Sequence, residues 1–218
     1  ALLQLVAYGA QNVVLTSNPQ ITFFKQVYRR HTNFATESVK CTFSGGATFG
    51  NKVTLKVPRN GDLLSKAYVR VAVSSGSVGL ADAKWAWVKN LGHAIIKTAE
   101  LTIGAQRIDL HTGDWNHVWY ELTHNNGQDR GYNKLIGNLV EHTTLASSHD
   151  EFVMYIPLNF FFCRHIGLAL PLVALQYHEV EITVTFEELK NLIITSGSIT
   201  ASDLGISMVD GSIFADYV

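Results

Sequence analysis

Charged residues are scarce in this sequence, since Asp, Glu, Lys and Arg make up only 16% of it, against roughly 25% in an average soluble protein. The 17 basic and 18 acidic residues leave a net charge of −1, so there is no overall positive field to attract DNA or RNA. With so few charges, much of the surface must be apolar or neutral, and large apolar patches mark interaction sites. The composition therefore favours association with protein partners over specific binding of nucleic acid.

Cysteine, N-glycosylation sequences and long apolar runs are also rare or missing. The two cysteines, Cys41 and Cys163, form no Cys-x-x-Cys unit, and two free thiols in a reducing compartment are preferred over a disulfide. No Asn-x-Ser/Thr sequence occurs, so nothing indicates N-glycosylation. The sequence has no run of about 18 apolar residues, which excludes a membrane-spanning helix within it.

Motifs of catalysis and cofactor binding are missing as well. No Gly-x-Ser-x-Gly elbow, Walker loop or dinucleotide-binding glycine motif follows a strand pattern, and the glycine-rich residues 44–50 are interpreted as a hairpin loop. Cys163 precedes His165 by two residues, so on a strand the two would share a face as a nucleophile pair. Because Cys163 lies in an aromatic run, a buried structural thiol is the favoured interpretation. We expect no enzymatic activity and no cofactor.

The nine histidines of the sequence raise the question of a metal site. The densest group of possible ligands consists of His111, His117, Glu121 and His124. On a helix, His117 and Glu121 could share a face, and a zinc site needs three or four converging ligands. The group has neither HExxH nor His-x-His spacing, so polar positions on an amphipathic helix next to buried tryptophans are preferred and no metal is expected.

Strand patterns dominate the chain. Residues 177–189 alternate apolar and polar positions, with one face formed by Val180, Ile182, Val184 and Phe186. Gly104 divides residues 99–111 into two strands joined by a tight turn. Further strand patterns cover residues 52–57, 64–73, 151–158 and 211–218.

Helical patterns are few. Asp114 is a candidate N-cap, and the residues after it place apolar side chains at i, i+3, i+4 and i+7, namely Trp115, Val118, Trp119 and Leu122. Residues 169–176 predict one short turn of helix. The sequence therefore predicts an all-β fold, an antiparallel β-sandwich with short helices in its connections. Long irregular connections favour a jelly roll over an immunoglobulin-type sandwich.

Five blocks of sequence, in the same order, resemble the major capsid proteins of nucleocytoplasmic large DNA viruses of the chlorella virus, iridovirus and mimivirus type. The first is LLQLVAYGAQNVVLTSNPQITFFKQVYRRHTNFATES, which resembles the N-terminal segment of that family. The others are DLLSKAYVRV, TIGAQRIDLHTGDWNHVWYELT, IPLNFFFCRHIGLALPLVALQYHEVEITVTF and FADYV. The resemblance covers essentially the whole chain.

The resemblance implies a viral jelly roll, the first of two in tandem, over residues 21–218 after an N-terminal arm over residues 1–20. A second jelly roll is expected beyond Val218, which makes the chain a fragment of a longer protein, with a single-barrel relative as the alternative. It further implies a homotrimer that forms a pseudo-hexameric capsomer and tiles an icosahedral shell. The implied partners are neighbouring capsomers and minor capsid proteins beneath the shell. An internal viral membrane would lie below without insertion of this chain. The implied location is the virion, after synthesis and assembly in the cytoplasm of the infected cell.

The basic and aromatic residues near the N-terminus then have a structural interpretation. A strand over residues 21–28 would carry large apolar groups on both faces, which suggests that it is covered on both sides. Arg can pair with a carboxylate in bidentate geometry across a subunit contact. The candidate inter-subunit or inner-shell contacts are Leu5, Tyr8, Phe24, Lys25, Arg29 and Arg30.

A soluble jelly-roll carbohydrate-binding module is the alternative from another functional class. The sequence contains four tryptophans that could stack on sugar rings, Trp85, Trp87, Trp115 and Trp119. Three of them lie in apolar or helix-periodic settings, which favours positions in the core. The capsid interpretation is therefore preferred.

Overall fold

The computed structural model describes residues 9–10, 32–79, 83–196 and 199–218. The chain divides into two units, Ala1–Ala35 and Thr36–Val218, and the fold described below is that of the second. The predicted strand over residues 21–28, all six candidate contact residues and almost all of the predicted arm lie outside the described residues. Those expectations, and the domain boundary at residues 20 and 21, stay predictions.

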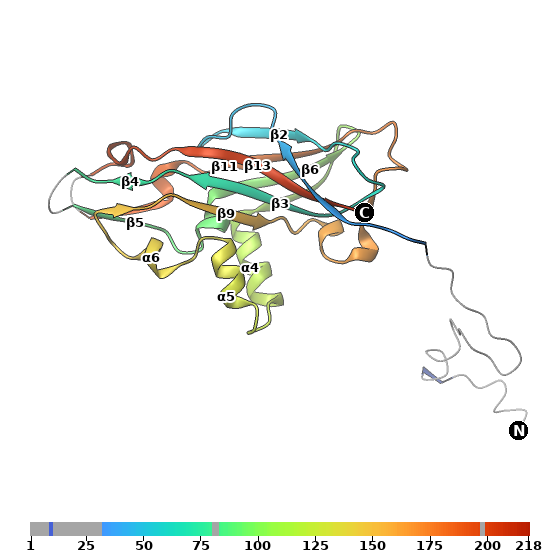
Figure 1. Ribbon diagram of the computed structural model, residues 1–218, viewed down its shortest axis with the longest axis horizontal. Coiled ribbons are helices and arrows are strands. Elements are labelled where there is room, and N and C mark those ends of the chain that lie inside the picture. Colours follow the sequence, from blue (N-terminus) through green and yellow to red (C-terminus); the bar gives the residue numbers. More distant parts are fainter. Residues whose placement is uncertain (1–8, 11–31, 80–82, 197–198) are drawn as a thin grey trace, which may run out of the picture. The chain divides into compact units, whose positions relative to one another are not determined.

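The second unit is built mainly of antiparallel strands (Figure 1). The long strands are β1 (Glu37–Thr42), β2 (Lys52–Lys56), β3 (Leu63–Val73), β6 (Ile96–Ile103), β7 (Gln106–Thr112), β9 (Phe152–Pro157), β11 (Val180–Phe186) and β13 (Met208–Tyr217). The short strands are β4 (Gly76–Ser77), β5 (Lys84–Trp87), β8 (Ser148–His149), β10 (Leu170–Pro171) and β12 (Ile193–Ser196).

The strand pairing is that of a jelly roll. One main sheet has the order β1-β13-β3 with β9 and β10 both on β3, and the other has the order β2-β11-β6-β7. Among the eight long strands taken in chain order, the first pairs with the eighth, the second with the seventh, the third with the sixth and the fourth with the fifth. A long hairpin wrapped into two facing sheets gives this pairing. The prediction of an antiparallel jelly roll is confirmed.

The core lies between the two sheets because the side chains alternate along each strand. In β11, all four residues of the predicted apolar face are buried. In β3 the buried positions recur in the same way, as at Val69, Val71 and Val73. Side chains of both sheets belong to one buried cluster, and Phe43 packs edge-on against Phe186 with ring centroids 6.3 Å apart.

The predicted hairpin around Gly104 is present. Ile103 pairs with Gln106, so the loop between β6 and β7 has only two residues, Gly104 and Ala105, with φ of 58° and 65°. Two consecutive positive φ values are the signature of a type I′ turn, whose twist matches that of the flanking strands. The hairpin brings β7 to the free edge of its sheet, directly before the segment that carries the candidate site.

Two predictions about connections were wrong. Residues 44–50 cross from one sheet to the other, since β1 and β2 lie in different sheets and only an isolated bridge joins Ser44 to Thr54. Residues 169–176 form β10 and turns instead of a helix. Pro171 disfavours helical geometry at Leu170, and Leu170 pairs with Leu64 of β3.

Among the described residues, three of the four α-helices lie in the connection between β7 and β9, where Figure 1 labels them. The α-helices are α3 (Leu91–Ile95), α4 (Gly113–Thr123), α5 (Asp129–Leu135) and α6 (Val140–Thr143), and the 3₁₀ helices are η1 (Phe161–Cys163), η2 (Ile166–Leu168), η3 (Leu189–Asn191) and η4 (Ala201–Leu204). In Figure 1, α4 and α5 project from the side of the sandwich on which β9 lies. No helix among the described residues is long and apolar enough to cross a membrane.

Candidate interaction surface on helix α4

The outward side of α4 is apolar. Val118 is 55% exposed and Leu122 is 78% exposed, whereas Asn116 on the opposite side is 1% exposed. Asp114 and Glu121 are also exposed and flank the two apolar residues, because positions three and four apart share a helix face. Asp114, Val118, Glu121 and Leu122 are together called the α4 face below. The predicted helix is present, but its apolar stripe does not all face the core.

The start of α4 explains this orientation. Thr112, the last residue of β7, is the N-cap, and its hydroxyl oxygen accepts a hydrogen bond of 3.2 Å from the backbone N–H of Trp115. The prediction of Asp114 as N-cap was wrong because the extended strand runs directly into the helix, two residues earlier. Asp114 instead lies in the first turn, where a carboxylate interacts favourably with the helix dipole.

A ladder of stacked rings fastens α4 to the sandwich. Phe160, which is completely buried, stacks on His111 of β7 at 5.0 Å between ring centroids. His111 stacks on Trp115 at 3.9 Å and Trp115 on Trp119 at 5.4 Å. The guanidinium of Arg164 covers the outer ring, 4.5 Å from the centroid of Trp119, in the arrangement of a cation–π contact. Trp115 and Trp119 lie between the sandwich and Arg164 and are only half-buried. The prediction that they lie in the core was wrong.

A second cluster fastens α5 to α4. Tyr120 of α4 and Tyr132 of α5 stack with ring centroids 3.8 Å apart. The hydroxyl of Tyr120 donates a 2.7 Å hydrogen bond to Asp129, and the hydroxyl of Tyr132 lies 2.7 Å from Nε2 of the buried His93. Burial and the neighbouring carboxylate raise the pKa of Tyr120 to about 12. The two helices thus form a rigid pair that holds the α4 face in place.

His93 makes this anchorage sensitive to acid. Burial, with a smaller effect from neighbouring His117, lowers the pKa of His93 from 6.5 to about 4. The folded state therefore holds His93 neutral, and its contribution to stability is complete above pH about 6.5 and lost as the pH falls towards 4. Between pH 7.5 and 4.5, we expect the unfolding free energy of the wild type to fall by about 2 kcal/mol more than that of His93→Gln.

Urea unfolding at the two pH values measures this difference. Burial also lowers the pKa of His111 and His142, but both residues are present in both proteins and contribute equally to each. Parallel pH profiles for the wild type and the variant would contradict the assignment to His93.

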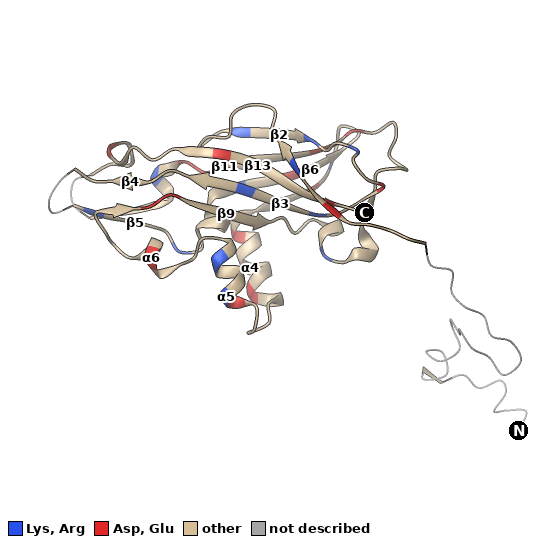
Figure 2. Cartoon of the chain, viewed as in Figure 1, with Lys and Arg blue, Asp and Glu red and all other residues tan. Residues whose placement is uncertain are grey.

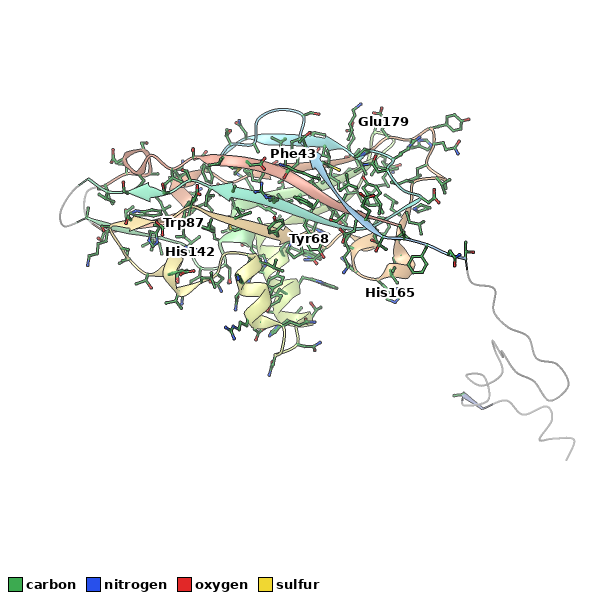
Figure 3. The ribbon with its side chains drawn as sticks, in the orientation of Figure 1. Phe43, Tyr68, Trp87, His142, His165 and Glu179 are labelled. Carbon is green, nitrogen blue, oxygen red and sulfur yellow. The ribbon has the colours of Figure 1, made fainter. Side chains whose placement is uncertain are left out.

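A small groove lies beside α4. It has a volume of about 290 Å³, and its aromatic lining consists of Tyr68, Trp119, Tyr120 and Tyr132. Tyr68 projects from β3 on the outer side of its sheet, close to the helix pair (Figure 3). Small-molecule sites typically have roughly 300–1,000 Å³, so the size of the groove suits a side chain of a partner better than a cofactor.

Of the residues that the sequence grouped as possible metal ligands, the structure pairs His117 with Glu121, whereas His111 and His124 each lie beside a different carboxylate. Nε2 of His111 lies 3.0 Å from Asp109, His117 lies 4.0 Å from Glu121, and His124 lies 3.5 Å from Asp129. Within the described part of the chain, no three His, Cys, Asp or Glu side chains converge as a metal site would require.

The candidate nucleophile Cys163 and the candidate sugar-binding tryptophans Trp85 and Trp87 also occupy structural positions. Cys163 is the last residue of η1 and not part of a strand, and burial raises the pKa of its thiol to about 12. Such a thiol is protonated at neutral pH, whereas nucleophilic attack requires the thiolate. Both cysteines are free. Trp85 and Trp87 are 0% and 1% exposed, so neither can stack on a sugar.

Sequence reasoning missed the outward orientation of Val118 and Leu122 and the role of Arg164. The four-residue spacing of the apolar pair was visible, but it predicts only that the two side chains share a face. Which face is covered depends on α3 and β6, against which the helix starts. The low charge content was the one sequence signal that an apolar surface would remain exposed.

The comparisons with known proteins place this architecture among viral capsid proteins. A family model described as the major capsid protein N-terminus matches residues 22–218. The major capsid protein of Pyramimonas orientalis virus is 45% identical over the whole chain, which spans 52% of that protein. Capsid protein 1 of Acanthamoeba polyphaga mimivirus is 40% identical, and the chain spans 39% of it. The chain thus covers about half or less of these curated relatives.

Solved structures agree. PBCV-1 VP54, fitted into a cryo-EM reconstruction of the virophage Sputnik, is 34% identical with a TM-score of 0.71, over 90% of this chain and 45% of that one. The Faustovirus major capsid protein has a TM-score of 0.74 over 96% of this chain and 58% of that one. At 13% identity, it supports the fold alone. The relatives are capsid proteins and not enzymes, which confirms the prediction of a structural role. The chain belongs to the family of major capsid protein N-terminal domains.

Proposed function

We propose that this chain is the first jelly roll of a major capsid protein that forms trimeric, pseudo-hexameric capsomers and tiles an icosahedral shell. The observation that carries the proposal is the match to capsid proteins of large DNA viruses along the whole chain. The exposed apolar residues of α4 support it, because a subunit in a shell needs apolar surface to bury against its neighbours.

In this role the subunit acts by packing against other subunits through fixed surfaces. The two sheets and the rigid α4–α5 pair form a stiff unit that presents fixed surfaces, so that little conformational freedom is lost on assembly. Obligate interfaces bury roughly 2,000 Å² or more, and identical contacts repeated over a shell multiply a modest pairwise free energy. Low charge density suits this role because like charges oppose close packing.

The proposed partners follow from the same role. They are two further copies in a trimer, neighbouring capsomers and minor capsid proteins beneath the shell, with no specific nucleic acid and an internal membrane below. Near the N-terminus, Leu5, Tyr8, Phe24, Lys25, Arg29 and Arg30 are proposed as contacts between subunits or with the inner shell. The proposed location is the virion, after synthesis in the cytoplasm of the infected cell.

The mass of the full-length protein in solution tests the proposal. Light scattering after gel filtration is expected to give three times the chain mass in the absence of any ligand, and negative-stain electron microscopy is expected to show pseudo-hexagonal particles. A stable monomer that binds sugars on a glycan array would contradict the proposal and support the carbohydrate-binding alternative.

A further inference from the structure

Two exposed surfaces on this chain complement each other in charge and in apolar character. The first is the α4 face. The second is the turn of residues 164–168, called the 164–168 turn, which contains η2. All five of its residues are exposed, and its two large apolar side chains, Ile166 and Leu168, are 67% and 52% exposed.

The α4 face is acidic. Helix α4 contains Asp114 and Glu121 and no Lys or Arg, and Glu121 is 56% exposed at its side chain. Figure 2 shows acidic but no basic residues on this helix. In the described part of the chain, the one basic side chain within 4.0 Å of these two carboxylates is the imidazole of His117, at 4.0 Å from Glu121. The carboxylates therefore flank Val118 and Leu122 without a Lys or Arg partner among the described residues.

The 164–168 turn has the opposite character. Residues 159–178 contain Arg164, His165 and His178 but no Asp or Glu. The turn is also preorganised, since Nδ1 of His165 accepts a 2.9 Å hydrogen bond from the backbone N–H of Gly167. In Figure 3, His165 lies at the edge of the molecule, on the side from which the helix pair projects. A rigid apolar turn with a guanidinium at its base fits an apolar face bordered by carboxylates.

We infer that the α4 face of one copy packs on the 164–168 turn of a second copy of this chain. Val118 and Leu122 would bury against Ile166 and Leu168, and the carboxylates of α4 would lie opposite Arg164. Because Arg164 also packs on Trp119 of its own chain, the ladder that fixes α4 fixes the turn as well. The contact joins unlike surfaces, so it is heterologous and can close into a ring. It rests on the proposed trimer and names the surfaces through which neighbouring copies meet.

Single charge insertions in the full-length protein test each half of the contact. Leu122→Asp and Ile166→Asp are each expected to abolish the trimer at protein concentrations at which the wild type is fully trimeric, because an unpaired charge would be buried in the contact. Val209→Asp is the matched control, since Val209 on β13 is 64% exposed and lies in neither surface. It should leave the trimer unchanged. Dissociation of a trimer by itself lowers the apparent thermal stability, so the fold is checked separately. The far-ultraviolet circular dichroism spectrum must match that of the wild type and unfolding must stay cooperative in all three variants.

A charge exchange tests whether the two surfaces meet each other. Glu121→Arg and Arg164→Glu are each expected to weaken the trimer, and the double variant is expected to restore it. The inference is overturned if the single aspartate variants remain trimeric, if Val209→Asp dissociates equally, or if the double variant is no better than the single ones. A wild-type protein that is not trimeric would instead overturn the proposed function, so the two failures are distinguishable.

Discussion

Gly113→Ala is expected to destabilise the jelly roll by about 3 kcal/mol or more, because the added methyl group has no space. An ideal Cβ on Gly113 would lie 2.7 Å from the carbonyl oxygen of Ile96 and still closer to that of His93. Both obstacles are backbone atoms, so they can move only if α3 or the start of β6 moves. The variant should therefore lift the first turn of α4 and disrupt the stack that begins with Trp115. Urea unfolding followed by tryptophan fluorescence measures both effects.

Gly131→Ala is the matched control for this substitution. Gly131 lies within α5, and a Cβ there would meet nothing within 4 Å. Alanine is better than glycine in a helix interior, so this variant should be stabilised by about 0.5–1 kcal/mol. If the two alanine variants changed stability alike, the close approach of α4 to α3 and β6 would not be what orients the helix.

Phe160→Ala is expected to lower the free energy of unfolding by about 3–5 kcal/mol, the range for removing a buried aromatic side chain. Phe160 is completely buried and contacts two other rings, with centroids 5.0 Å away at His111 and 5.9 Å away at Phe162. Its removal would leave a cavity beneath the ladder, so the fluorescence of Trp115 and Trp119 should change in the folded state as well. Chemical denaturation and emission spectra check the two expectations separately.

Phe34→Ala provides the comparison for Phe160→Ala. Phe34 is 74% exposed, and surface substitutions of this kind usually change stability by less than about 0.5 kcal/mol. A small loss of unfolding free energy for both variants would mean that Phe160 does not support the stack of rings on α4. A large loss for Phe160→Ala with unchanged tryptophan emission would confirm its place in the core but not its support of α4.

Much of the fold could be predicted from local patterns. The alternation of apolar residues in β11 and the glycine turn between β6 and β7 depend on residues close in sequence, and both are present in the structure. Predictions failed where the outcome depended on distant segments. Residues 169–176 have a helical apolar pattern, but β3 offers Leu170 a strand partner. Residues 44–50 resemble a hairpin loop, but the strands on either side join different sheets.

For the α4 face, too, local sequence predicted some features and distant segments decided others. The sequence predicted a helix with Val118 and Leu122 on one side, and that helix is present. It could not predict that this side faces outward, because Thr112 caps the helix and α3 and β6 cover the opposite side through Gly113. The contact between Arg164 and Trp119 spans a distance in sequence that no local pattern encodes.

By itself, the sequence determined the β-rich class, the apolar alternation that builds two facing sheets and the resemblance to capsid proteins, because these are carried by residue types and short spacings. Only the tertiary structure decided which strands pair, where the connections cross between the sheets and which side of α4 remains uncovered. The physical reason is that an apolar stripe gains free energy from any apolar partner. Its pattern specifies that it will be buried, while the arrangement of distant segments specifies whether the partner lies within the same chain or in another copy.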